Sequence, residues 1–101
     1  MIKHIVMWNV HGETAVAKAH NAQRLKRAFE GLREQIPGLL RLEIGLDESG
    51  VDYACDAVLY AEFESRQALD DYAHHPAHTR VRHELEGVRT ARHQVDFEFT
   101  D

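Results

Sequence analysis

The chain has 101 residues, 44% of them hydrophobic and 29% charged, a composition typical of one globular domain over residues 1–101. Its net charge of −5 and the lack of any Lys/Arg run argue against nucleic acid or a membrane surface as a partner. No apolar run approaches the roughly 20 residues that span a bilayer.

The first half of the chain predicts a strand, a long helix and a second strand. Residues 2–10 are rich in β-branched and aromatic side chains and precede a His-Gly break, as a strand would. Residues 13–36 have helix-forming composition and place one apolar stripe at helical spacing, formed by Leu25, Phe29, Leu32 and Ile36. The Pro37-Gly38 pair should end this helix. Residues 39–46 then alternate apolar and polar side chains, which predicts the second strand.

The second half predicts two strands around a broken helix. Residues 53–63 follow a turn-forming Asp-Glu-Ser-Gly cluster and should form the third strand. Residues 66–73 should form a short helix with Ser65 as a natural N-cap, and Pro76 forces a new helical start, so that residues 77–86 form the next helical piece. Residues 89–99 alternate again and close the chain as a strand. The order β-α-β-β-α-β predicts an α+β, ferredoxin-like fold with a four-stranded antiparallel sheet.

Apolar side chains on both faces of the predicted sheet indicate self-association. In this fold the helices cover one face, so the other face of a monomer should be polar. The first strand instead places Ile5 and Met7 on the face away from its other apolar residues, Ile2, Val6, Trp8 and Val10. Monomers rarely expose so large a patch. We predict a homodimer whose sheets pack face to face as a dimeric α/β barrel; the alternative is a monomer whose long helix shields part of that face.

Candidate catalytic groups lie between Asp71 and His78 and in the first strand. His78 follows Pro76 near a helix start, and an ordinary pKa of about 6.5 suits it to act as a general base or acid. Its alternative role is to pack the helix start. Tyr72 is suited to donate a proton to an enolate or alkoxide, or else is an amphipathic core residue. His4 is either a pocket residue or a buried imidazole satisfied by hydrogen bonds.

We expect no metal and no cofactor. His74 and His78 have the i,i+4 spacing of a zinc-binding helix, but Pro76 restarts the helix between them, so the rings should not share one face. The glycines form no phosphate-binding loop. Cys55 is the only cysteine and is interpreted as a buried strand thiol, which fits a protein of the reducing cytoplasm.

The chain resembles the stress-responsive α/β-barrel (Dabb) family over essentially its whole length. The resemblance rests on the Ile-Lys-His-Ile-Val start at residues 2–6, Phe-Glu-Ser at 63–65, and Asp71-Tyr72 followed by His75-Pro76-Ala77-His78. It implies a homodimer whose sheets form a barrel, with a pocket between the sheet and helices of each subunit. Some members look like non-catalytic, stable assemblies. One branch is a plant polyketide cyclase that closes a ring by an aldol reaction without a metal or organic cofactor.

The resemblance also implies site residues. The cyclase's acid–base tyrosine and histidine fall on Tyr72 and His78, and its first-strand histidine falls on His4. A further pocket histidine of the cyclase corresponds to Ala57 here, so the cyclase substrate is not carried over.

Three functions follow as hypotheses. The first is a homodimeric protein with a pocket for a small apolar carbonyl or aromatic ligand and an undecided reaction. The second is a cofactor-independent acid–base enzyme of aldol or lyase type that uses Tyr72, His78 and His4. The third, by analogy of fold, is a cofactor-free monooxygenase.

Overall fold

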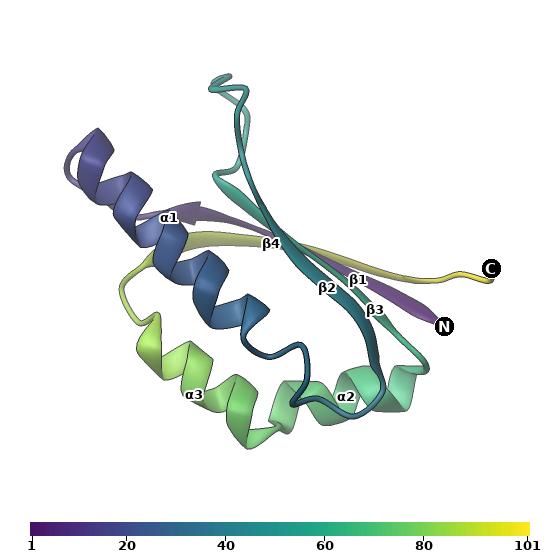
Figure 1. Ribbon diagram of the computed structural model, residues 1–101. Coiled ribbons are helices and arrows are strands. Elements are labelled where there is room, and N and C mark those ends of the chain that lie inside the picture. The colour runs from purple at the N-terminus through teal and green to yellow at the C-terminus, as the bar shows by residue number, and fades with distance from the viewer.

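A computed structural model describes residues 1–101. Its elements in chain order are β1 (Ile2–Val10), α1 (Ala15–Glu30), β2 (Leu39–Leu46), β3 (Ala57–Phe63), α2 (Arg66–His74), α3 (Pro76–Glu84) and β4 (Arg89–Glu98). The strands form one antiparallel sheet in the order β2-β3-β1-β4, and all helices lie on one face of it (Figure 1). This confirms the ferredoxin-like fold with a broken second helix. No helix has the length and apolar character needed to cross a membrane.

The hydrophobic core lies between the helices and the covered face of the sheet. The central strands β1 and β3 alternate strictly, and every inward side chain on them is at most 5% exposed. Val6 and Leu59, for example, are opposite each other in the register of the two strands. Leu25 and Phe29 of α1 close the core from the helical side, as the apolar stripe predicts.

Two element boundaries differ from the prediction. Helix α1 ends at Glu30, where Gly31 and i→i+3 hydrogen bonds such as Leu32 N–H to the Phe29 carbonyl replace the α-helical pattern. Leu32 is still buried, so the apolar spacing continues through turns and made the helix look longer. Strand β3 begins at Ala57 and not at Tyr53, because residues 52–55 turn away from the sheet and Tyr53 is 91% exposed. Asp56 joins this loop to the sheet, since its carboxylate accepts the Val10 N–H at 2.8 Å. Cys55 therefore lies half-buried in a loop and not in a strand.

Gly38 fits a narrow space where the chain enters β2. Its φ is +81°, and a Cβ there would lie 2.6 Å from the Ala68 Cβ of α2. Gly50 also has a positive φ, +65°, but a Cβ there would meet nothing within 4 Å. Left-handed backbone costs an alanine roughly 1–2 kcal/mol at either position. We expect urea unfolding to show a larger loss of unfolding free energy for Gly38→Ala than for the matched control Gly50→Ala. Equal losses would contradict the tight contact with α2.

Candidate active site

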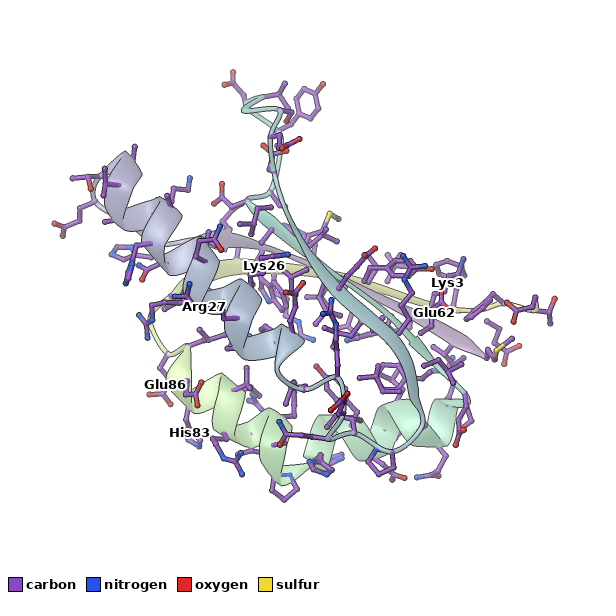
Figure 2. All side chains as sticks on the ribbon, viewed as in Figure 1. Lys3, Lys26, Arg27, Glu62, His83 and Glu86 are labelled. Carbon is purple, nitrogen blue, oxygen red and sulfur yellow. The ribbon has the colours of Figure 1, made fainter.

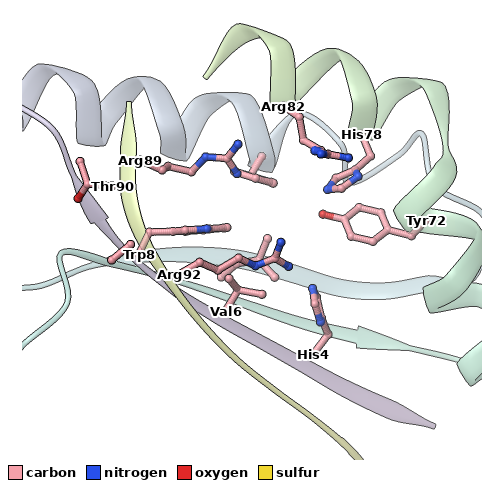
Figure 3. Close-up of a pocket in the computed structure, with 12 residues that line it drawn as sticks. His4, Val6, Trp8, Tyr72, His78, Arg82, Arg89, Thr90 and Arg92 are labelled. Atoms are coloured by element: carbon pink, nitrogen blue, oxygen red, sulfur yellow. The ribbon is translucent and has the colours of Figure 1, made fainter. Parts of the chain in front are cut away.

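A cavity of about 310 Å³ lies between the sheet and the helices. Apolar side chains form one wall, contributed by Val6 and Trp8 of β1, Phe29 of α1 and Leu59 of β3. The indole of Trp8 stacks on Phe29 with 5.0 Å between ring centroids. Ionisable side chains from β1, α2, α3 and the start of β4 form the remaining walls (Figure 3).

Tyr72 and His78 come together at this cavity because of the helix break. His75 has extended backbone (φ −67°, ψ 138°), as expected for a residue before proline, and α3 starts in a new direction at Pro76. Tyr72 near the end of α2 and His78 in the first turn of α3 then have ring centroids 4.3 Å apart. Tyr72 is 3% exposed, and its hydroxyl points into the cavity in Figure 3.

The surroundings give these two rings complementary protonation states. Burial lowers the pKa of His78 to about 4, and the positive charges of Arg82, Arg89 and Arg92 act in the same direction. The Ala73 carbonyl accepts the His78 Nδ1–H at 3.4 Å, which leaves the lone pair on Nε2. Burial raises the pKa of Tyr72. At neutral pH the cavity therefore holds an imidazole able to accept a proton beside a phenol able to donate one.

The low pKa of His78 makes stability depend on pH. The folded-state pKa of about 4 lies below the ordinary 6.5, so the unfolded chain binds the proton more tightly. The contribution of His78 to stability is complete above pH 6.5 and is lost as the pH falls from 6.5 towards 4. We expect the NMR signals of His78 to titrate near pH 4, and the unfolding free energy of His78→Asn to fall less than that of the wild type across this window. Titration near pH 6.5 would contradict the burial.

His4 lies on β1 next to this pair and is both a cavity residue and a satisfied buried imidazole. Its ring centroid is 6.2 Å from that of Tyr72, and only 5% of the residue is exposed. Asp96 of β4 is opposite His4 in the strand register and accepts the His4 Nδ1–H at 2.6 Å. This hydrogen bond engages Nδ1 and fixes the orientation of the ring. Figure 3 shows the ring directed towards the cavity.

Four residues of the site were not predicted from the sequence: Asp96, which holds His4, and three arginines of the cavity, Arg82, Arg89 and Arg92. The signal for Arg82 is its spacing, since it follows His78 by four residues on α3 and so shares a helical face with it. Asp96 and Arg92 share the alternation of β4, but which β1 residues they face depends on strand register, which the pattern alone leaves open.

The other histidines of the segment have structural positions. His75 caps α3, because its Nδ1 accepts the Ala77 N–H at 3.0 Å. His74 is exposed, and its Nδ1 lies 3.0 Å from the Asp70 carbonyl. His74 and His78 thus have separate partners, and no three His, Cys, Asp or Glu side chains are grouped as metal ligands.

The family model of the stress responsive A/B barrel domain matches residues 2–99 of the chain. The chain belongs to this family, Dabb. A comparison with curated proteins gives no match.

Solved structures share the fold of this Dabb chain. A dimeric ferredoxin-like protein of unknown function from Bacteroides fragilis is 29% identical over 97% of this chain and 95% of its own, with a TM-score of 0.85. A dimeric ferredoxin-like protein of unknown function from Thermobifida fusca is 19% identical over 97% and 90%, with a TM-score of 0.81. Hydroxynitrile lyase from Passiflora edulis is 10% identical over 99% and 94%, with a TM-score of 0.80. The last two likenesses show the fold alone.

Proposed function

We propose that this Dabb protein is a homodimer in which each subunit's cavity performs acid–base chemistry on a small carbonyl compound. The observation that carries the proposal is the Tyr72–His78 pair. A neutral imidazole and a protonated phenol lie 4.3 Å apart, ring to ring, in a partly open cavity with an apolar wall. Proton transfer beside a carbonyl requires a base and an oxyanion donor, and this pair supplies both.

We propose a role for each group. His78 Nε2 accepts a proton from the carbon next to the substrate carbonyl. The C–H electron pair forms a carbon–carbon double bond, and the π pair of the carbonyl moves to its oxygen to give an enolate. The Tyr72 hydroxyl donates a hydrogen bond to that oxygen. His4, held by Asp96, orients the substrate from β1. The enolate then has three possible fates. Attack on a second carbonyl is an aldol reaction, expulsion of a leaving group is a lyase reaction, and protonation at another atom is an isomerisation.

Deuterium exchange tests the proposal without knowledge of the natural substrate. The protein is incubated in D₂O with a panel of oxo acids and aryl ketones, and NMR follows the protons next to the carbonyl. We expect enzyme-dependent exchange with at least one compound, and exchange with none would overturn the proposal. A cofactor-free monooxygenase would start from the same carbanion, so oxygen uptake that matches substrate loss would favour that reaction instead.

The outer face of the sheet supports the homodimer. No helix covers it, and Met7, Val95 and Phe97 on this face are 39%, 59% and 42% exposed (Figure 1). Ile5 is opposite Tyr60 on one side and Val95 on the other, so an apolar row crosses three strands. The charged side chains on this face include Lys3 and Glu62, which are opposite each other in register (Figure 2). The dimeric relative from Bacteroides fragilis adds support.

We propose that residues 1–101 fold as one domain, since one cluster of 21 buried apolar residues draws on three strands, β1 to β3, and all three helices, while β4 pairs with β1 along its length. We also propose a cytoplasmic location, which rests on the single cysteine and its lack of a disulfide partner.

A further inference from the structure

The cavity concentrates positive charge that has no acidic partner. Arg82, Arg89 and Arg92 line it, and no Asp or Glu does (Figure 3). None of these arginines forms an ion pair, whereas other basic residues of the chain do, among them Lys18, Lys26, Arg33 and Arg41. The chain as a whole carries a net charge of −5. Three like charges on one cavity of an acidic protein are unfavourable unless an anion joins them.

Two of the arginines are held in place by the protein. Arg89 is half-buried, and its Cζ lies 5.5 Å and 5.8 Å from the ring centroids of Trp8 and Phe29. The neighbouring Arg92 and Arg82, together with burial, lower the pKa of Arg89. This guanidinium therefore lies against the apolar wall, where it is partly shielded from water and has no counter-ion among the side chains.

Arg92 belongs to a chain of hydrogen bonds that reaches His4. Its Nη2 donates to Gln94 Oε1 at 2.5 Å, and Gln94 Nε2 donates to Asp96 Oδ2 at 2.9 Å. The other Asp96 oxygen accepts from His4. The side chains that orient His4 thus also orient a cavity guanidinium, so the charge and the acid–base groups form one arrangement.

We infer that the cavity takes carbonyl compounds that also carry a carboxylate, with Arg89 and Arg92 binding the carboxylate beside the wall formed by Trp8 and Phe29. Guanidinium groups bind carboxylates through paired, charge-assisted hydrogen bonds. The wall suits an aromatic or short aliphatic body, and the cavity volume of about 310 Å³ limits its size. The inference rests on the proposed function, since it names the substrate class of the same site: small oxo acids.

Binding of simple acids tests the charge requirement. Trp8 is the only tryptophan, so its fluorescence reports on the cavity, and calorimetry checks the affinities. The probes are benzoate, 2-oxobutyrate, neutral benzamide and inorganic phosphate. We expect benzoate or 2-oxobutyrate to bind at least about tenfold more tightly than benzamide, and more tightly than phosphate. Equal affinity for the acid and the amide, tighter binding of phosphate, or no saturable binding of either acid would overturn the inference.

Variants identify the residues responsible. Arg89→Gln and Arg92→Gln should each weaken carboxylate binding about tenfold or more, as expected for the loss of a charge-assisted hydrogen bond. Arg80→Gln is the matched control, because Arg80 is an exposed α3 residue outside the cavity, and its affinity should equal that of the wild type. Unfolding curves establish that each variant is folded. Carboxylate affinity that is unchanged in folded Arg89→Gln and Arg92→Gln would contradict the inference.

The two proposals fail in different ways. Arginine-dependent carboxylate binding without deuterium exchange on any carbonyl compound would keep the anion site and remove the acid–base function. Exchange that proceeds equally well with neutral ketones and in Arg89→Gln would keep the acid–base function and remove the carboxylate requirement.

Discussion

Replacing His78 with asparagine should slow deuterium exchange beside the substrate carbonyl by about 10²–10⁴-fold, the usual contribution of a positioned general base. Asparagine is close to histidine in size and can still donate to the Ala73 carbonyl. It has no nitrogen lone pair that can accept a proton from carbon. The measurement is NMR-detected exchange in D₂O at neutral pH, where His78 is unprotonated because its pKa is about 4.

Tyr72→Phe separates the oxyanion role from packing in the same assay. Phenylalanine keeps the ring that packs 5.2 Å from Phe63 and removes only the hydroxyl. We expect a rate loss of about 10²–10³-fold, the range for one removed oxyanion donor. His83→Asn is the control: His83 is exposed on α3 and pairs with Glu86 at 3.1 Å, away from the cavity (Figure 2). Wild-type rates in both His78→Asn and Tyr72→Phe would remove these residues from catalysis.

The three arginines of the cavity affect how strongly His78 acts as a base. A base with a pKa of about 4 is always available at neutral pH, yet it holds a proton weakly. The three guanidiniums contribute to that low value, so an anion placed among them would offset their charge and raise the basicity of His78. A carboxylate on the substrate would in this way strengthen the base that acts on it. A neutral substrate would meet the weaker base.

Local patterns predicted most of the fold from the sequence. β-Branched and aromatic composition with flanking turn residues located β1 and β3, alternation located β2 and β4, and Ser65 and Pro76 marked the starts of α2 and α3. The largest boundary error arose where burial continued beyond regular structure. Leu32 is buried in a turn after α1, so apolar spacing alone placed the helix end too late.

The candidate site was predictable only where its residues lie near one another along the chain. Tyr72 and His78 are six positions apart, on either side of a helix break that Pro76 predicts from the sequence. The Asp96 partner of His4 lies 92 positions away and depends on the pairing of β1 with β4. Arg89 reaches the cavity through its contact with Trp8, a packing detail that follows from the tertiary structure. Long-range register and side-chain packing are the information that composition and spacing lack.

Val95→Glu should convert the proposed dimer into a monomer. Val95 is 59% exposed on the outer face of the sheet and extends the apolar row formed with Ile5 and Tyr60. In a two-fold dimer each substitution occurs twice, so two unpaired carboxylates would be buried in one interface. An unpaired buried charge costs about 3–5 kcal/mol, which raises the dimer dissociation constant by at least about 10²-fold.

Sedimentation at micromolar concentration measures this effect directly. The wild type should sediment at twice the 11.6 kDa mass of the chain, and Val95→Glu at the mass of one chain. Val16→Glu is the matched control, because Val16 is 80% exposed in the first turn of α1 and does not lie on the sheet. It makes the same chemical change and should stay dimeric. If Val95→Glu stayed dimeric as well, the subunits would have to meet through another surface. A monomeric wild type would mean that the apolar face of the sheet is open to water.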